Sequence, residues 1–358
     1  MGKTFTHIFP KEKFTEDYVT LVNDQLSHDD KHLFFLYGDE TYDELVNPLY
    51  RLDNVKTFKF DFYLLVSMIK SEQIIFHSLL MRTKILVGFI FFPTLIRKAT
   101  WVIWGADLYD YKFSKENISQ RIRFFIKRNI TKKFKKIAVL TDSDFSLSKK
   151  WYKTTGKKYN VRYIDYQTID YIKTVEETIK KNIFSDKKIR ILIGNNATET
   201  NRHKEVFKLL SKFEDSDFEV HVPLSYGDEA YKEEVLISGK ELLKDKFLPI
   251  TSYMKKTDYF NFLSEMDIAF FNNNRQQALG NIRILMYFST KIYMNKNSSM
   301  YKDMHGKYVL YDINDVKQQS FDDLVKIENK SLENNKVEVS EFFTIEVAVE
   351  EWKTLFYC

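Results

Sequence analysis

Cysteine, glycine and proline are all scarce in this chain. Its 358 residues include 1 cysteine, 10 glycines and 5 prolines. Cys358 stands alone, which excludes an intramolecular disulfide and is typical of a protein from a reducing cytosol. So little glycine and proline excludes a collagen-like repeat and a flexible linker rich in either residue.

Long apolar runs are also missing. The first residues, MGKTFTHIFPKEK, lack the apolar core of a signal peptide. The most apolar run, residues 85–96, contains Pro93 and is shorter than the roughly 20 residues that span a bilayer. We expect this run to be either a buried helix end or a segment that lies in a membrane interface.

Neither sign of charge dominates. Lys and Arg number 55 against 50 Asp and Glu, so the net charge of +5 is too small to mark a nucleic-acid-binding protein. Hydrophobic residues make up 44% and charged residues 29%, which is typical of a folded globular protein, and 358 residues suit two domains. Aromatic residues reach 16%, enough to fill a core and also to line a sugar site.

Short apolar strands alternate with helical patterns along most of the chain. In the first half we expect strands at 5–9, 32–37, 73–77, 100–105 and 136–141, and helices near 17–26, 61–70, 79–89, 115–133 and 145–155. In the second half we expect strands at 189–194, 218–223, 247–250, 267–271, 291–295 and 307–311. This rhythm predicts two Rossmann-like α/β domains with parallel sheets. They are placed at 1–165 and 188–340, with a linker at 166–187 and a C-terminal helix at 341–358.

Two strands of the second domain run into polar loops that lead into helices. Gly194 and Asn195 follow the first of these strands, and residues 271–281 follow the other. Loops after parallel strands meet at one sheet edge, and the first N–H groups of a helix have no internal partner. The pattern therefore predicts an anion site, such as one for the phosphates of an activated sugar donor. The alternative is an ordinary pair of capped loops.

The second loop carries the most specific side chain of this edge, Arg275. A guanidinium fork suits a diphosphate better than any other side chain. Gln276 and Gln277 can donate to phosphate or sugar oxygens, and Gly280 leaves room at the start of the helix. Between the two loops, Tyr226 can stack on the base or sugar and Glu229 can accept hydroxyls. The alternatives are a solvated surface arginine and an acidic helix start favoured by the macrodipole.

Two residues of the first domain are candidates for acid–base chemistry. Asp107 follows an apolar strand and Gly105, and His77 ends the neighbouring strand. A base that takes a proton from the acceptor hydroxyl has to stand at such a strand end. We expect Asp107 to be the base or an acceptor ligand, with His77 close by. Alternatively, Asp107 only caps a turn and His77 is structural.

A basic segment follows in the same domain. Eight Lys and Arg and no acid lie between Arg121 and Lys136, and Ile and Phe residues interleave with them. Such a segment can lie on anionic lipid, at about 1 kcal/mol for each basic residue near the surface. The expected membrane contacts are Arg121, Arg123, Lys127, Arg128, Lys132 and Lys133. The alternatives are a helix with a solvated basic face and, more weakly, a nucleic-acid site.

Several catalytic signatures are absent from the sequence. It has no His-Glu-x-x-His, no cysteine pair for zinc, no phosphate loop ending Gly-Lys-Ser and no Gly-x-Ser-x-Gly. We therefore expect no metal site and no cofactor.

Four blocks carry a resemblance to one enzyme family. They are VIWGADLYDY (102–111), IGNNATETNRH (193–203), VPLSYGDEAYKEEV (222–235) and RQQALGN (275–281). Their order and spacing resemble those of the bacterial TDP-N-acetylfucosamine:lipid II N-acetylfucosaminyltransferases, glycosyltransferase family 56. The likeness is strongest from Ile191 to Met304 and weak over the first seventy residues.

The resemblance adds roles for particular residues. It implies that Asn201 and His203 belong to the donor site together with Gly194 and Asn195. It likewise favours the functional interpretation of the Tyr226–Glu229 block and of the Asp107 and His77 pair. The family's Arg-Gln-Gln-Gly-x-Gly-Thr pattern is altered here, because Ala278 and Asn281 replace its first Gly and its Thr, which puts the donor sugar in doubt.

The family is similar to two-domain glycosyltransferases of the GT-B type. That implies parallel sheets facing a cleft and a last helix that can cross back to the first domain. It implies transfer of a deoxyamino sugar from a nucleotide donor, TDP, to a lipid-linked oligosaccharide. The expected place is the cytoplasmic face of the bacterial inner membrane, bound peripherally to an anionic surface and without nucleic acid. The alternatives are a sugar-nucleotide epimerase of the same fold and a non-catalytic membrane-associated assembly protein.

Overall fold

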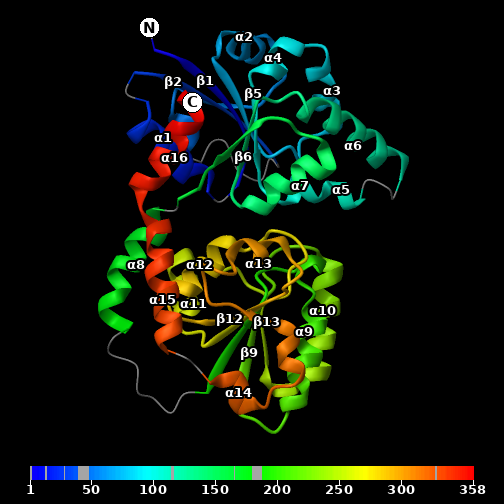
Figure 1. Ribbon diagram of the computed structural model, residues 1–358, viewed down its shortest axis with the longest axis vertical. Helices are drawn as coiled ribbons and strands as arrows, with labels where there is room; N and C mark the ends of the chain where they lie inside the picture. The colour runs from blue at the N-terminus through cyan, green and yellow to red at the C-terminus, as the bar shows by residue number, and fades with distance from the viewer. Residues whose placement is uncertain are drawn as a thin grey trace. The chain divides into compact units, whose positions relative to one another are not determined.

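The computed structural model describes residues 2–12, 14–27, 29–38, 48–113, 117–164, 166–179, 188–326 and 329–358. The chain divides into two compact units, which we call the first and the second unit. The first unit comprises Met1–Tyr166 and Thr344–Cys358, and the second comprises Gln167–Phe343. Each is a parallel sheet covered by helices (Figure 1).

The first unit contains a seven-stranded sheet in the order β3-β2-β1-β4-β5-β6-β7. Its strands are β1 (Thr4–Pro10), β2 (Lys31–Tyr37), β3 (Val55–Thr57), β4 (Gln73–His77), β5 (Ala99–Ile103), β6 (Lys136–Val139) and β7 (Lys157–Asn160). Its helices are α1 (Thr15–Gln25), α2 (Phe62–Lys70), α3 (Thr83–Ile90), α4 (Pro93–Arg97), α5 (Ala106–Phe113), α6 (Ile118–Thr131), α7 (Asp142–Tyr152) and α16 (Ile345–Tyr357). Every strand pairing in this sheet is parallel.

The local sequence explains where these elements lie. All residues of β4 and of β5 are buried, as expected for central strands covered on both faces. The Asp61 side chain caps α2 by accepting from the Leu64 N–H, and Asn117 caps α6 in the same way. The short strands β3 and β7 were not expected, because three or four largely polar residues show no apolar run.

The second unit contains a six-stranded parallel sheet in the order β10-β9-β8-β11-β12-β13. Its strands are β8 (Ile189–Ile193), β9 (Phe218–Pro223), β10 (Phe247–Ile250), β11 (Ile268–Phe271), β12 (Lys291–Met294) and β13 (Tyr311–Asp312). Its helices are α9 (His203–Leu210), α10 (Glu229–Leu243), α11 (Lys256–Ser264), α12 (Leu279–Tyr287), α13 (Ser299–Met304), α14 (Phe321–Val325) and α15 (Asn329–Ser340), and α8 (Tyr166–Ile179) lies almost wholly in this unit. The prediction of two parallel α/β sheets is confirmed.

Helix α16 packs on the first unit although it ends the chain. The Trp352 indole N–H donates to the Arg162 carbonyl oxygen over 2.9 Å. The Arg162 guanidinium binds the Glu351 carboxylate through two contacts of 2.7 and 3.0 Å. Residues 166–179 of the expected linker form α8, whereas residues 180–187 lie outside the described residues.

Candidate functional site

The second unit has one point at which the chain order of its strands reverses, between β8 and β11. Ligands of open α/β sheets bind beyond the carboxyl ends of the strands at such a point. The two polar loops predicted from the sequence leave the sheet here, after Ile193 and after Phe271. The Gly194 N–H donates to the Phe270 carbonyl oxygen over 3.0 Å, so the loop after β8 begins directly against β11.

Gln277 ties the two loops together. Its side-chain N–H groups donate to Asn195 Oδ1 over 2.9 Å and to Asn196 Oδ1 over 3.3 Å. Its amide oxygen accepts from the Thr200 hydroxyl over 2.7 Å. Because the amide nitrogen and the amide oxygen of Gln277 both bond the loop after β8, Gln277 fixes the two loops relative to each other.

Gly194, Asn201 and His203 form the base of the site. Gly194 has φ +67°, and a Cβ added to it would lie 2.7 Å from His203 Nε2 and 3.1 Å from Asn201 Oδ1. A side chain at Gly194 would therefore clash with His203 and crowd Asn201. Burial lowers the pKa of His203 to about 3, so its ring is neutral near pH 7.

Three side-chain atoms around these loops are buried and, within the described structure, have no hydrogen-bond partner. They are His203 Nε2, Asn273 Oδ1 and Gln276 Oε1. Buried polar atoms in native proteins are almost always paired, so such a group calls for a bound molecule. Asn273 was missed by the sequence analysis, although its amide also donates to Asn201 Oδ1 over 2.9 Å.

Arg275 lies beside this group and is half-buried. Its Nε donates to the Thr200 hydroxyl over 3.4 Å, which links it to the loop after β8. Ala278, at the end of the same loop, has φ +60° and caps α12. That is the position where the family pattern carries its first glycine, and glycine is the residue best suited to this left-handed conformation.

The remaining donor-site candidates lie at the same sheet edge with different contacts. Tyr226 is half-exposed, and its hydroxyl accepts from the Asn195 amide over 3.3 Å. Glu229 begins α10, is largely exposed and pairs with Lys232 over 3.1 Å. Gly280 has open space where a Cβ would stand, so the start of α12 is uncrowded at this residue.

In the first unit, Asp107 is an internal anchor and not an accessible base. It is the second residue of α5 and is 0% exposed. Its carboxylate accepts from the Leu79 N–H over 2.9 Å, the Trp101 indole N–H over 2.6 Å and the Trp104 N–H over 3.0 Å. A base has to reach the acceptor proton, so this geometry does not favour the role expected from the sequence.

His77 is likewise enclosed. Its Nε2 lies 3.0 Å from His7 Nδ1, and its Nδ1 lies 2.5 Å from the Tyr163 hydroxyl. His7 continues the chain to His32, over 2.9 Å. Burial lowers the pKa of His7, His32 and His77 below the usual value, so all three rings are neutral near pH 7. With both ring nitrogens engaged inside the fold, His77 has no free nitrogen for an acceptor.

The chain order of strands in the first unit reverses between β1 and β4. Glu12 follows β1 and is exposed, and Ser78 follows β4 with φ +74° and a buried hydroxyl. Side chains held in the left-handed region are enriched at functional sites. Sequence reasoning missed both residues, because the neighbourhood of β1 and β4 follows only from the topology.

Residues 121–131 of the basic segment lie in α6, and their cations point in different directions. Lys127 is 1% exposed on its side chain, and its ammonium donates to the Asp107 carbonyl oxygen. Arg123 donates to the Met81 carbonyl oxygen over 2.7 Å and to the Leu79 carbonyl oxygen over 3.1 Å. The membrane contacts expected at Lys127 and Arg123 are therefore wrong, because both side chains donate to carbonyl oxygens inside the first unit.

The other four expected contacts stay accessible. Arg121, Lys132 and Lys133 are exposed, and Arg128 is half-buried. Among the described residues, no group of three or more His, Cys, Asp or Glu side chains could hold a metal ion. No helix of the described ranges is long and apolar enough to span a membrane.

Solved structures share this fold over nearly the whole chain. A glycosyltransferase from Rickettsia africae is 12% identical with a TM-score of 0.66, covering 99% of this chain and 98% of that one. Sucrose-phosphate synthase from Thermosynechococcus elongatus is 10% identical with a TM-score of 0.68, covering 99% and 98%. Anabaena HepE, solved in complex with UDP, is 12% identical with a TM-score of 0.66, covering 98% and 99%. The GT-B type of fold is confirmed.

The family follows from a model that matches residues 64–357, most of the chain. That model describes the 4-alpha-L-fucosyltransferases of glycosyl transferase group 56. The match includes both loops at the β8 and β11 edge as well as α6 and α16. The expected transfer of a sugar is confirmed, and the chain belongs to the 4-alpha-L-fucosyltransferase family, glycosyl transferase group 56.

Proposed function

We propose that the sugar donor is a nucleoside diphosphate sugar, that its nucleotide is TDP, and that it binds at the β8 and β11 edge of the second unit. The acceptor is a lipid-linked oligosaccharide, and the enzyme works on the cytoplasmic face of the bacterial inner membrane. The observation that carries the donor site is the group of three buried, unpartnered atoms on His203, Asn273 and Gln276 beside Arg275. HepE, a neighbour with the same fold, is solved with UDP.

Each of these side chains has a role in donor binding that follows from its chemistry. The Arg275 guanidinium binds the diphosphate and stabilises the negative charge that grows on the leaving nucleotide. The amide oxygens Asn273 Oδ1 and Gln276 Oε1 then accept hydrogen bonds from sugar or ribose hydroxyls of the donor, and His203 Nε2 makes a further hydrogen bond to it. Gln277 holds the two loops in register through its contacts with Asn195 and Thr200.

The acceptor oxygen has to lose its proton while the donor C–O bond breaks. Because Asp107 and His77 are enclosed, we assign the base to Glu12, the exposed carboxylate that follows β1. A carboxylate at a strand end beside the reversal point is accessible to an acceptor hydroxyl. The acceptor oxygen forms a new bond to the sugar carbon as its proton passes to the Glu12 carboxylate, and the nucleoside diphosphate leaves with the electrons of the broken C–O bond.

Replacing Arg275 by alanine tests the donor site. Loss of a charge-assisted contact is expected to weaken nucleoside diphosphate binding by about 1.5–3 kcal/mol, or about 10- to 150-fold. Calorimetric titration of the full chain measures this. Arg190→Ala is the matched control, because Arg190 lies at the opposite end of β8 and pairs with Glu219 and Glu265. Equal nucleotide affinity in Arg275→Ala and wild type would remove Arg275 from the donor site.

A second surface supports membrane attachment. Ile118, Ile122 and Phe125 of α6 are 74%, 52% and 68% exposed. Their spacing of four and then three residues puts them on one face of the helix, which we call the α6 stripe. Large apolar side chains gathered on an exposed face mark a membrane or protein contact. A helix of this kind lies in the interface plane of a bilayer.

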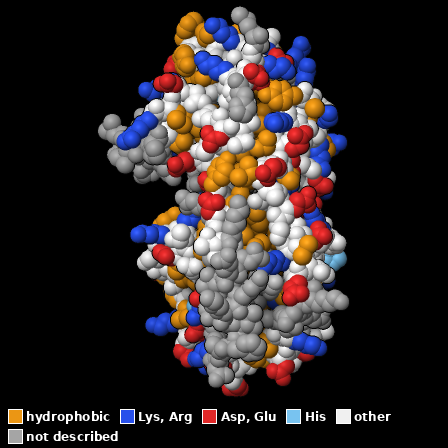
Figure 2. Space-filling model, turned by 90° about the vertical axis from the view of Figure 1, so that its left-hand side faces the viewer, with side chains coloured by type: hydrophobic (Ala, Val, Ile, Leu, Met, Phe, Trp, Pro, Cys, Tyr) orange, Lys and Arg blue, Asp and Glu red, His pale blue; other side chains and the backbone are white. Residues whose placement is uncertain are grey.

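The charges around the α6 stripe suit an anionic lipid surface. Residues 117–141 contain no Asp or Glu, and neither do residues 73–106, which include α3, the helix beside α6 in Figure 1. On the side of the first unit that carries α16, acidic and basic side chains are instead interspersed (Figure 2). The acid-free layer of α3 and α6 is therefore the face that we assign to the membrane.

Changing Ile118 and Phe125 together to serine is expected to weaken binding to anionic vesicles at least about tenfold, because two large apolar side chains no longer enter the bilayer. Vesicle co-sedimentation measures the partition coefficient. Ile237→Ser in the second unit is the control, since Ile237 is 68% exposed and far along the sequence. If wild type does not bind vesicles, or if the double variant binds as tightly as wild type, the membrane assignment is wrong.

A further inference from the structure

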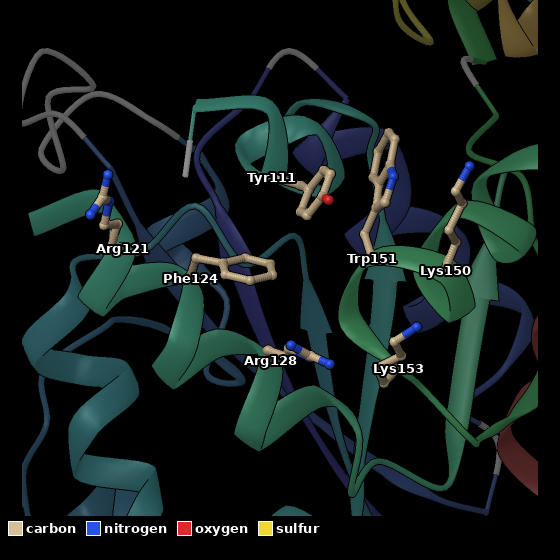
Figure 3. Close-up of a pocket in the computed structure, with 7 residues that line it drawn as sticks. All are labelled: Tyr111, Arg121, Phe124, Arg128, Lys150, Trp151 and Lys153. Atoms are coloured by element: carbon tan, nitrogen blue, oxygen red, sulfur yellow. The ribbon is translucent and has the colours of Figure 1, made fainter. Parts of the chain in front are cut away.

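A pocket of about 400 Å³ lies between α5, α6 and α7 of the first unit (Figure 3). None of its lining residues was placed in the donor site or the acid–base chemistry. They are Tyr111, Arg121, Phe124, Arg128, Lys150, Trp151 and Lys153. Four of these seven side chains are cationic, three are aromatic and none is acidic. The lining therefore combines positive charge with aromatic surface.

The aromatic side chains form a fixed wall. The Tyr111 and Trp151 rings stack at 4.9 Å between centroids with an angle of 12° between their planes. Phe124 meets the edge of Tyr111 at 5.4 Å. All three are half-buried and pack against the hydrophobic core of the first unit. Figure 3 shows Tyr111 between Phe124 and Trp151.

Of the cationic residues, Arg121 and Arg128 lie in α6, Lys150 lies in α7, and Lys153 follows α7. Arg128 extends from α6 toward the side where Lys150 and Lys153 lie (Figure 3). Like charges brought together repel one another, so a pocket with four cations and no acid favours a multiply charged anion. The nearby carboxylate of Asp110 is already held by Arg123 and by Lys127 at 3.4 and 3.2 Å.

Lys153 stands in an unusual conformation for a lysine. It follows α7 with φ +59°, in the left-handed region where helices usually end on glycine. A side chain in this region costs conformational energy that glycine avoids. Lys153 therefore places a cationic side chain in the pocket lining at a position whose backbone conformation favours glycine.

The pocket also adjoins the α6 stripe. Arg121 and Arg128 lie seven residues apart on α6, on the flank of the face that presents Ile118 and Phe125. A ligand with phosphates in the pocket can thus have an apolar chain along the stripe. An arginine fork binds phosphate in two contacts, and lysine adds a point charge.

We propose that this pocket binds the diphosphate group of a lipid diphosphate, with the first isoprenoid or acyl carbons against Tyr111, Phe124 and Trp151. The proposal rests on the proposed function, because it names where a lipid-linked acceptor is held. The same diphosphate chemistry is offered by free pyrophosphate and by the released nucleotide. The apolar wall and the adjoining stripe favour the lipid-borne form.

Trp151 provides a direct readout of ligand binding. Farnesyl diphosphate, used below its micelle-forming concentration, is expected to change the tryptophan fluorescence of the full chain, and Trp151→Phe should abolish that change. Pyrophosphate should bind at least about tenfold more weakly, because it lacks the apolar contacts. Farnesol should not compete, because it lacks the charge. Tighter binding of pyrophosphate than of farnesyl diphosphate would overturn the lipid-borne form.

Two variants separate binding from folding. Arg128→Gln is expected to weaken farnesyl diphosphate binding about tenfold or more. Lys153→Gly should weaken it as well, while the thermal midpoint stays equal or rises because glycine suits φ +59°. Lys149→Gln is the control, because Lys149 is an exposed lysine of α7 outside the pocket. Unchanged affinity in both pocket variants, or an equal loss in Lys149→Gln, would overturn the proposal.

Measuring donor binding separates a failure of the pocket assignment from a failure of the proposed function. In the pocket variants the affinity for nucleoside diphosphate is expected to match wild type, because the donor loops lie in the second unit. If farnesyl diphosphate fails to bind while donor binding and sugar transfer to a water-soluble acceptor persist, the pocket assignment alone is wrong. If donor binding itself is absent, the proposed function is wrong.

Discussion

Asp107→Ala is expected to destabilise the first unit by about 3–5 kcal/mol, the range for leaving a buried charge network without one member. The Asp107 carboxylate accepts three N–H groups, from Leu79, Trp101 and Trp104. Removing it leaves those donors buried without partners, at about 1–3 kcal/mol each before relaxation. Urea unfolding, with donor binding by the second unit as a separate probe, measures the effect.

Asp142→Ala is the matched control for this result. Asp142 is largely exposed and makes one surface ion pair, with Lys158 at 2.5 Å. A surface pair contributes about 1 kcal/mol or less, so the control should stay close to wild type. A stable Asp107→Ala protein without transfer activity would contradict the anchor role and return Asp107 to the position of catalytic base.

Glu12→Gln is expected to lower turnover by about 10²–10⁴-fold, the usual contribution of a positioned base. The amide keeps the shape of the side chain but cannot take the acceptor proton. Because Glu12 is exposed, unfolding free energy and donor affinity should both stay at wild-type values. Steady-state transfer kinetics give the rate, and calorimetry gives the donor affinity.

Glu16→Gln serves as the control for charge, since Glu16 is an exposed glutamate in the first turn of α1. Its turnover should match wild type. A fully active Glu12→Gln enzyme would remove Glu12 from the mechanism. An equal loss in both variants would show that the local negative charge, and not proton transfer at Glu12, sets the rate.

The strands and helices with strong apolar patterns could be predicted from the sequence, and those without could not. Strands β4 and β5 are buried on both faces, and each carries a run of three large apolar residues, at 74–76 and 101–103. Strands β3 and β7 have few apolar residues and are held by pairing with a neighbour, which no local pattern reveals. Asp107 was expected at an accessible strand end, but it lies in the first turn of α5 and is buried.

In the candidate site, too, some residues could be predicted from the sequence and others depend on tertiary packing. Arg275 and Gly194 could be identified because their chemistry and their place after apolar strands are visible in the sequence. The partnerless atoms of His203, Asn273 and Gln276 depend on how the two loops meet in space. Helical spacing located the basic residues of α6, but only packing shows that Lys127 faces inward and that Phe125 faces outward.

The most direct test of the central claim is mass spectrometry of products. The full-length enzyme is mixed with TDP-, UDP- and GDP-linked deoxyamino sugars and with an oligosaccharide linked to a prenyl diphosphate. The account predicts that the acceptor gains the mass of one sugar residue while one equivalent of nucleoside diphosphate, TDP, is released, and that Arg275→Ala slows this transfer. An acceptor that stays unchanged with every donor, or a donor that is only epimerised, would contradict it.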